Sequence, residues 1–309
     1  MPADVDSPQI ADDAWSRWLL SRDGGSASYH RILRDHLEQM RDRILDAAGL
    51  CEGITLLDLG AGDGLLGLGA IDRIGPSLRA IFTDISAPIL RHVQRVADDR
   101  GIAAQCSFHT CTAEHQDELW DASVDVVVSR AALAFVANKH AALCEIFRVL
   151  KPGGRLSIGE PILQDTSLQL IALQKFMAAN PYDPQAEFLR LKHRLQAAQF
   201  PSTVDATLAN PLTNFTERDL VEMAKEIGFS KIHMELHMDA RPSLATEWEV
   251  YLNTSPHPLA PAPREILAKL FSEAERKTFE QYMRPTIEAG RSSSTDVFAY
   301  LTAEKPTRV

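Results

Sequence analysis

The residues with the clearest chemical potential are an acid and three glycines between positions 58 and 64. Asp58 follows an apolar run (54 to 57) that is predicted to form a buried strand, and Gly60, Gly62 and Gly64 precede a predicted helix. Glycine lets the backbone turn sharply and lets a ligand approach the main chain. A strand, a glycine turn and a helix N-terminus together form a nucleotide-binding arrangement in α/β sheets. A carboxylate at this place would repel a pyrophosphate and attract a cationic amino group.

A second acid, Asp84, lies 20 residues after Gly64, at the end of the next predicted strand. An acid there can accept hydrogen bonds from ribose hydroxyls, or it can cap the following helix. Residues 62 to 67 also fit the GxGxxG fingerprint of dinucleotide binding, which leaves NAD as an alternative ligand. Two features oppose NAD: Asp58 and Asp63 would crowd its pyrophosphate, and the glycine turn begins before the fingerprint does.

Composition narrows the class of protein. The chain has 309 residues, 45% of them hydrophobic, which is enough for a large core. We expect neither a membrane span nor a secretory signal, because no apolar run is long enough to cross a bilayer and the N-terminus is acidic rather than basic and then apolar. A net charge of −10 argues against a protein whose main function is to bind the phosphates of nucleic acids. Four cysteines without a CxxC pair predict reduced thiols in a cytoplasmic protein and no zinc site.

The elements that must position these residues alternate between strand and helix. Repeated β-α units of this length predict an α/β fold with a doubly wound, mostly parallel, Rossmann-like sheet of seven strands, the last of them antiparallel. The expected strands are residues 54–57, 79–83, 104–109, 124–128, 155–159, 232–238 and 295–302.

Three ordered motifs resemble class I S-adenosylmethionine (SAM)-dependent methyltransferases. The glycine turn resembles their first motif, and residues 121–129, Asp-Ala-Ser-Val-Asp-Val-Val-Val-Ser, resemble their strand-four motif. Residues 148–156, Arg-Val-Leu-Lys-Pro-Gly-Gly-Arg-Leu, closely match the helix and turn that follow. The core is similar to that of the ubiquinone/menaquinone methyltransferases. The resemblance covers residues 54–161 and favours the glycine register that starts at Gly60.

The resemblance implies SAM as the cofactor. Asp58 would face the methionine amino group, Asp84 the ribose, and Ile85 would stack on the adenine. Thr112 and Ala113 would contact the adenine. The family usually has an aspartate where this chain has Thr112, and a hydroxyl is a weaker acceptor than a carboxylate.

Two further residues follow the fourth predicted strand. The resemblance implies that Ser129 lines the methionine end of the site. Arg130 would neutralise a carboxylate of the cofactor or the acceptor, or it would form a structural ion pair.

The expected domain organisation places the SAM-binding core in three pieces, separated by two insertions. The chain would comprise an N-terminal helical segment (1–50), the core (51–161), a helical insertion (162–215), continued core (216–242), a second insertion (243–291), and a last core strand with its tail (292–309). We expect the N-terminal helices and the insertions to cap the ligand edge of the sheet. The helix expected from about Ser28 to Gly49 could instead pack on a sheet face.

Methyl transfer depends mainly on in-line positioning, because the sulfonium already carries a good leaving group. A base is required only for a hydroxyl or a protonated amine. Glu160, at the end of the fifth predicted strand, is the first candidate base, and His30 is the second. The candidate acceptor contacts are Tyr29, Tyr182, His193 and Trp248, with His257 in the same set. His233 and His237 fall on one face of a predicted strand, so no metal site is expected.

The sequence therefore predicts a cytoplasmic SAM-dependent methyltransferase that acts on a small molecule, with no nucleic-acid or membrane partner. A SAM-binding protein without catalysis and an NAD-dependent oxidoreductase are the alternatives. The methylated atom and the oligomeric state, a homodimer included, are left open.

Overall fold

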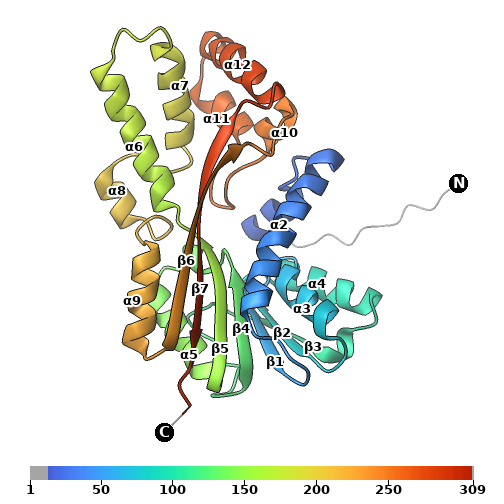
Figure 1. The fold of residues 1–309 in the computed structure, drawn as a ribbon. Coiled ribbons are helices and arrows are strands. Elements are labelled where there is room, and N and C mark those ends of the chain that lie inside the picture. The colour runs from blue at the N-terminus through green and yellow to red at the C-terminus, as the bar shows by residue number, and fades with distance from the viewer. Residues whose placement is uncertain (1–12, 308–309) are drawn as a thin grey trace, which may run out of the picture.

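The computed structural model describes residues 13–307, which contain one seven-stranded sheet with helices on both faces (Figure 1). The strand order is β3-β2-β1-β4-β5-β7-β6. The strands are β1 (Thr55–Leu59), β2 (Arg79–Asp84), β3 (Cys106–Thr110), β4 (Val124–Arg130), β5 (Leu150–Pro161), β6 (Ser230–Pro242) and β7 (Ser293–Glu304). Only β7 runs against its neighbours, β5 and β6. The seven-stranded, doubly wound sheet with an antiparallel last strand is confirmed.

The central strands are apolar on both sides because helices cover both faces of the sheet. Val126 and Val128 of β4 pack in one apolar cluster, and Val127 packs in the other. This alternation is that of a strand whose successive side chains point to opposite faces. Helices α2 (Ala27–Ala47), α3 (Leu65–Ile74) and α4 (Ala87–Asp99) cover the first face. Helices α5 (Lys139–Val149) and α9 (Glu217–Ile227) cover the second.

Helix ends follow the expected capping chemistry. The Thr216 side chain accepts a hydrogen bond from the backbone N–H of Asp219, and the Asp219 carboxylate accepts from the backbone N–H of Thr216, so the two residues form a capping box at the start of α9. The helix ends at Gly228, whose φ of +103° suits glycine.

The two insertions form a helical cap with its own apolar core (Figure 1). The first contains α6 (Gln164–Ala179), α7 (Ala186–Ala197) and α8 (Val204–Ala209), and the second contains α10 (Trp248–Asn253), α11 (Pro263–Leu270) and α12 (Glu273–Glu288). Side chains of α7, α10, α11 and α12 share one buried cluster. Strands β6 and β7 extend out of the sheet toward this cap (Figure 1).

Two local predictions differ from the structure. The turn at residues 151–154 was expected to precede a strand of residues 155–159, but β5 already begins at Leu150, which pairs with Val124. A register shift in β4 between Val124 and Val126 accommodates the extra residues. The short helix α8 was not predicted, because a six-residue helix gives too few turns for apolar periodicity to show. The sequence also predicts a short helix over residues 11–20, which carries Trp15, Trp18, Leu19 and Leu20. This helix would begin outside the described residues, and α1 (Ala14–Ser21) is the part that the structure describes.

Candidate functional site

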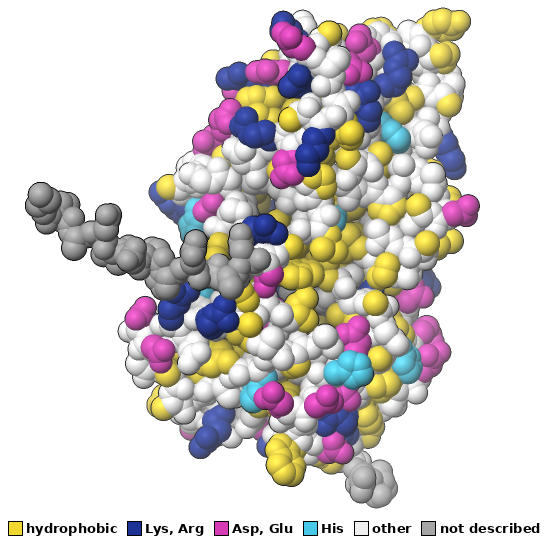
Figure 2. All heavy atoms as spheres, turned by 180° about the vertical axis from the view of Figure 1, so that it is seen from behind, with side chains coloured by type: hydrophobic (Ala, Val, Ile, Leu, Met, Phe, Trp, Pro, Cys, Tyr) yellow, Lys and Arg dark blue, Asp and Glu magenta, His cyan; other side chains and the backbone are white. Residues whose placement is uncertain are grey.

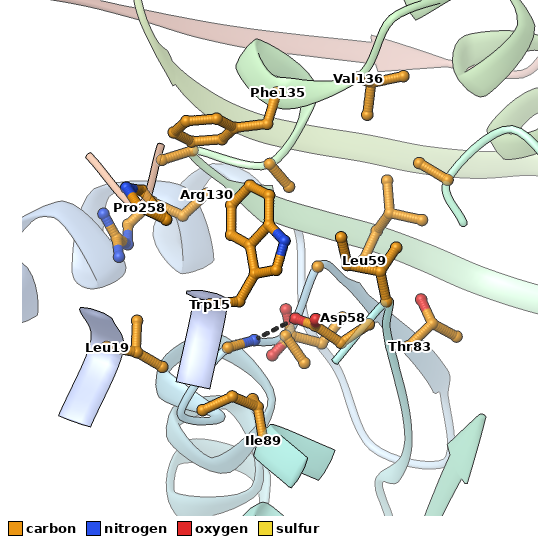
Figure 3. A pocket seen from close by; sticks show the side chains of 18 of the residues that line it. Trp15, Leu19, Asp58, Leu59, Thr83, Ile89, Arg130, Phe135, Val136 and Pro258 are labelled. Carbon is orange, nitrogen blue, oxygen red and sulfur yellow. Dashed lines mark hydrogen bonds between the residues drawn. The ribbon is translucent and has the colours of Figure 1, made fainter. Parts of the chain in front are cut away.

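A cavity of about 440 Å³ opens at the carboxyl ends of β1, β2 and β4 (Figure 3). Its walls come from the glycine turn, from the loops after β3 and β4, from α1, and from residues 256–258 of the second insertion. Parallel α/β sheets bind ligands at this edge, beyond the carboxyl ends of their strands.

The glycine turn lies against the loop after β4. Gly60, Gly62 and Gly64 have φ values of +66°, +55° and +79°, a region that L-residues with a side chain rarely adopt. A Cβ added to Gly60 would lie 2.4 Å from the Cβ of Ala132. Gly60 and Gly62 line the cavity, whereas Gly64 forms the N-cap of α3 and packs against Val93 and Leu68.

Asp58 lies at the floor of the cavity and is 1% exposed. Its carboxylate accepts a hydrogen bond of 2.8 Å from the backbone N–H of Gly67. Burial, together with the nearby charges of Asp63 and Asp84, raises its pKa to about 8, although the Gly67 hydrogen bond and the charge of Arg130 act in the opposite direction. A cationic group in the cavity would lower this pKa and would pair with the carboxylate.

Asp84 holds the glycine turn while it faces the cavity. One carboxylate oxygen accepts from the backbone N–H of Gly62 (3.0 Å), and the other accepts from that of Ser86 (2.9 Å). Each carboxylate oxygen has a second lone pair. Asp84 can therefore accept hydrogen bonds from ligand hydroxyls without releasing the turn. Burial raises its pKa.

Two buried polar atoms beside the cavity have no hydrogen-bond partner among residues 13–307. They are the hydroxyl of Thr83, next to Asp84, and the side-chain oxygen of Gln116, in the loop after β3. Buried polar groups normally have partners, so such groups in a cavity wall indicate a polar ligand. Together with Asp58 and Asp84, they fit a nucleoside that carries a cationic group, as SAM does.

Ile85, Thr112 and Ala113 line the same end of the cavity. Ile85 is 49% exposed in the protein alone, which leaves its side chain available to a flat ligand. The loop after β3 is held by the Gln116 side chain, which donates to the Thr112 carbonyl (2.6 Å).

Helix α1 covers the cavity. Trp15, Trp18 and Leu19 line it, and Trp15 lies edge-on to Phe135 with ring centroids 5.0 Å apart (Figure 3). The helix is fixed at its N-cap, where the Asp13 carboxylate accepts from the Ser86 hydroxyl (2.7 Å). Its neighbour α2 packs on the sheet face instead. The helix expected from about Ser28 to Gly49 thus takes the sheet-face alternative, and the shorter helix α1 lies over the cavity.

Glu160 lies at the expected strand end but does not face the cavity. It is fully buried, and its carboxylate accepts three backbone hydrogen bonds, from Ala132 (3.2 Å), Leu133 (3.2 Å) and Ala134 (2.9 Å). Burial raises its pKa to about 7 against these three donors. The structure thus places Glu160 as the support of the loop after β4, which contradicts its expected position as a base in the site.

Lys139 holds the far end of that loop. Its ammonium donates to the carbonyls of Val136 (3.0 Å) and Pro211 (2.7 Å) and lies over the ring of Phe215. Burial lowers the pKa of Lys139 to about 8. Glu160 and Lys139 thus fix the segment that brings Phe135 and Val136 to the cavity.

Ser129 and Arg130, the last residues of β4, differ in their placement. Ser129 is fully buried, and its hydroxyl donates to the Leu59 carbonyl (2.8 Å), so it joins β4 to β1 rather than lining the cavity. Arg130 lines the cavity, and its side chain forms neither a hydrogen bond nor an ion pair with any residue from 13 to 307. Burial and the nearby Arg22 lower its pKa.

The remaining candidate residues lie away from the cavity. His30 contacts Asp23 (3.0 Å) beside a separate surface pocket, and Tyr29 is not among the lining residues. Tyr182 is 97% exposed between α6 and α7, while Trp248 is buried in the core of the cap and His193 lies on α7. These side chains belong to elements whose packing depends on distant parts of the chain, so their types alone did not reveal their location.

His257 does line the cavity, but both of its ring nitrogens are engaged. Nδ1 accepts from the Leu259 backbone N–H (3.3 Å), so Nε2 carries the proton and donates to the Gln199 carbonyl (3.1 Å). Burial lowers its pKa, which keeps the ring neutral.

Other contributors were missed by the sequence analysis. Pro256, Pro258 and Phe298 reach the cavity from the second insertion and from β7, and no local motif marks them. Gly67 supplies the hydrogen bond to Asp58, and a Cβ there would lie 2.3 Å from the Phe82 ring. Gly67 is the third glycine of the GxGxxG pattern, and this glycine allows close helix–strand packing. The pattern could therefore have predicted that Gly67 packs closely against a strand.

Metal ligands and membrane spans were also sought within residues 13–307. No group of three or more His, Cys, Asp and Glu side chains there could hold a metal ion. None of the helices in that part of the chain is both long and apolar enough to cross a bilayer.

Comparison with known proteins places this fold and site in a family. The family model described as "Methyltransferase domain" matches residues 50–206, about half of the chain. The ubiquinone/menaquinone biosynthesis C-methyltransferase UbiE of Cellvibrio japonicus is 34% identical over 145 residues, 47% of this chain and 55% of the relative. A tRNA 5-carboxymethoxyuridine methyltransferase of Escherichia coli is 29% identical over 122 residues, 40% of this chain and 45% of the relative. The chain thus spans about half the length of the curated relatives it matches.

Solved structures share the fold at low sequence identity. The YcgJ protein of Bacillus subtilis matches with a TM-score of 0.55 and 18% identity, over 88% of this chain and 99% of that one. Phosphoethanolamine N-methyltransferase 2 of Haemonchus contortus, solved in complex with SAM, matches with a TM-score of 0.53 and 17% identity, over 96% and 61% of the two chains. With the family model covering the glycine turn, the loops after β3 and β4 and the first insertion, the chain belongs to the class I SAM-dependent methyltransferases.

Proposed function

We propose that this protein transfers the methyl group of SAM to a small-molecule acceptor held in the cavity under α1 and the helical insertions. The observation that carries the proposal is the shape of the site. The cavity of about 440 Å³ runs from the polar glycine turn to an apolar end walled by the second insertion. Its size is typical of small-molecule sites. Four unpaired cysteines suit a reducing compartment, so we expect the reaction in the cytoplasm.

Each proposed cofactor contact has a physical reason. Asp58 would pair with the methionine ammonium, and Asp84 would accept from the ribose hydroxyls. Ile85 would cover one face of the adenine, with Thr112 and Ala113 at its edge. The sulfonium supplies the electrophilic methyl group, and the protein aligns the acceptor and excludes water.

A binding comparison tests the cofactor assignment. Isothermal titration calorimetry with SAM, S-adenosylhomocysteine (SAH) and NAD should give binding of SAM and SAH and none of NAD. Binding of NAD without SAH would refute the proposal and support the oxidoreductase alternative.

A transfer experiment tests the acceptor class. Label from methyl-labelled SAM should appear in the low-molecular-mass fraction of a metabolite extract and not in tRNA. Label in tRNA would refute a small-molecule acceptor. SAH binding without any transfer would favour a SAM-binding protein that does not catalyse.

A further inference from the structure

The end of the cavity beyond the glycine turn combines apolar walls with a single cation. Phe135, Leu163, Pro258 and Phe298 contribute hydrophobic surface there, and Arg130 is the only Lys or Arg among the described residues that line the cavity. In Figure 3, Arg130 lies near Pro258 and Phe135. Figure 2 shows hydrophobic side chains gathered midway down the face, between the cap above and the sheet below.

Arg130 has no anionic partner of its own in the described part of the chain. Its neighbour Arg22 pairs with Asp63 at 2.8 Å, whereas the Arg130 side chain has neither a hydrogen bond nor an ion pair there. Removing a guanidinium from water is costly unless it is paired. Its planar donors match a carboxylate in a two-point contact. An unpaired, half-buried arginine in a cavity wall is therefore suited to an anionic ligand.

Most acids of the cavity lie at the glycine turn. Asp58, Asp63 and Asp84 surround this turn, where a cationic cofactor would bind, and Glu114 lines the cavity from the loop after β3. The charges of Asp58 and Asp63 act on Arg130, but neither carboxylate forms an ion pair with it among residues 13–307. Arg130 lies in Figure 3 on the other side of the Trp15 ring from Asp58 and Thr83. Its guanidinium is therefore available to an anionic ligand that binds beyond the turn.

Three side chains that could act as a base, Glu160, His257 and Cys111, are engaged or protonated, whereas Glu114 lines the cavity from the loop after β3. Glu160 accepts three backbone hydrogen bonds and has no exposed surface. Both His257 nitrogens are bonded to backbone groups. Burial raises the pKa of the Cys111 thiol to about 11, so it is protonated at neutral pH. An acceptor that arrives already ionised would not need a base.

We propose that the acceptor is an organic acid with a flat, apolar body, whose ionised carboxylate is held by Arg130. This inference rests on the proposed function, because it names the acceptor of the same site. A carboxylate oxygen lone pair forms the new O–CH₃ bond while the electrons of the methyl–sulfur bond return to sulfur. The products are a methyl ester and a neutral thioether, and no proton is transferred.

Two probes of the same shape and different charge test the inference. 2-Naphthoate and 2-naphthamide are titrated by calorimetry into SAH-loaded wild-type protein, Arg130→Met, Arg130→Lys and the control Arg95→Met. Arg95 is an exposed residue of α4 that does not line the cavity. In the wild type and in Arg95→Met, the acid should bind at least about tenfold more tightly than the amide, as expected for a charge-assisted contact. Arg130→Met should abolish the preference and leave SAH affinity within about threefold, and Arg130→Lys should keep part of the preference.

Three results would overturn the inference. They are equal affinity of acid and amide for the wild type, no binding of either, and an Arg130→Met variant that loses SAH affinity as strongly as acid affinity. The last would assign Arg130 to the cofactor carboxylate. Labelled SAM should also give alkali-labile label on 2-naphthoate, and tight binding without such label would refute the methyl-ester step. If SAH does not bind the wild type at all, the proposed function itself fails.

Discussion

Replacement of Glu160 by glutamine separates a positioning role from a catalytic one. Two of the three backbone donors, Ala132 and Leu133, contact one carboxylate oxygen, and Ala134 contacts the other. A glutamine can place its carbonyl oxygen toward the first pair only, so its amide NH₂ would face the Ala134 N–H. An amide nitrogen cannot accept as either carboxyl oxygen can, so one buried N–H donor is left without a partner, which costs about 1–3 kcal/mol.

This free energy converts into a measurable change in thermal stability. A loss of about 2 kcal/mol lowers the melting temperature by roughly 4–8 °C in a domain of 150–250 residues, and by somewhat less in a larger one. Because the loop after β4 also carries Phe135 and Val136 to the cavity, we expect a higher KM for the acceptor and a kcat within about tenfold of wild type. SAH affinity should change little, since Glu160 does not line the cavity.

The pH dependence gives an independent check with a defined sign. The pKa of Glu160 is raised from 4.5 to about 7 in the folded protein. Its contribution to stability is therefore fully present below about pH 4.5 and is lost as the pH rises through about 7. Chemical denaturation at several pH values should show the stability difference between wild type and Glu160→Gln narrowing over this range. Glu52→Gln, which changes an exposed carboxyl before β1, is the matched control.

A general base would behave differently. If Glu160 acted as a base, Glu160→Gln would lower kcat by about 10²–10⁴ with little change in melting temperature. Activity would also follow an ionisation near pH 7 that the variant lacks. That combination would refute the positioning argument, as would a variant with unchanged stability and unchanged acceptor KM.

Three further outcomes follow from the glycine turn and its acids. Asp84→Ala should weaken SAH binding by roughly tenfold or more in calorimetry, because a charged acceptor is lost; unchanged affinity would remove Asp84 from the site. Because burial raises the pKa of Asp58 to about 8, SAH affinity should rise between about pH 6 and 7.5 as the Asp58 carboxyl ionises. The same titration should be flat for Asp58→Asn, and a parallel rise in this variant would contradict a role for Asp58 in binding SAH. Gly60→Ala should lose both stability and SAH binding, because its Cβ would lie 2.4 Å from that of Ala132. Gly25→Ala is the control: Gly25 has a φ of +79° and no atom within 4 Å of an added Cβ, so this variant has only the backbone strain of about 1–2 kcal/mol. Equal melting temperatures for the two variants would show that the contact is unimportant.

The strand, turn and helix around Asp58 could be predicted because their signals are local. Apolar runs, alternating glycines and an acid at the strand end all lie within about a dozen residues, and the same logic placed Asp84. Glu160 was also expected at the correct strand end. Its orientation was not predictable, because it depends on three N–H groups from the segment after a different strand.

The acceptor end was harder to predict because it is assembled from distant segments. Phe298 and Pro258 reach the cavity from the last strand and the second insertion, and neither belongs to a motif. Trp248 and Tyr182 looked suitable by residue type, yet one is buried in the core of the cap and the other is almost fully exposed. Residue type therefore carried information only where local structure already fixed the direction of the side chain.

The loop after β4 connects both ends of the site. It begins at Arg130, passes the Ala132 contact with Gly60, and continues to Phe135 against Trp15. Glu160 beneath it and Lys139 at its end hold it through backbone groups, so its course does not depend on the side chains that face the cavity. The protein can therefore keep the cofactor turn in place while the residues of this loop define the acceptor. On this basis, changes at Phe135 should alter acceptor choice, whereas changes at Glu160 should weaken binding of every acceptor alike.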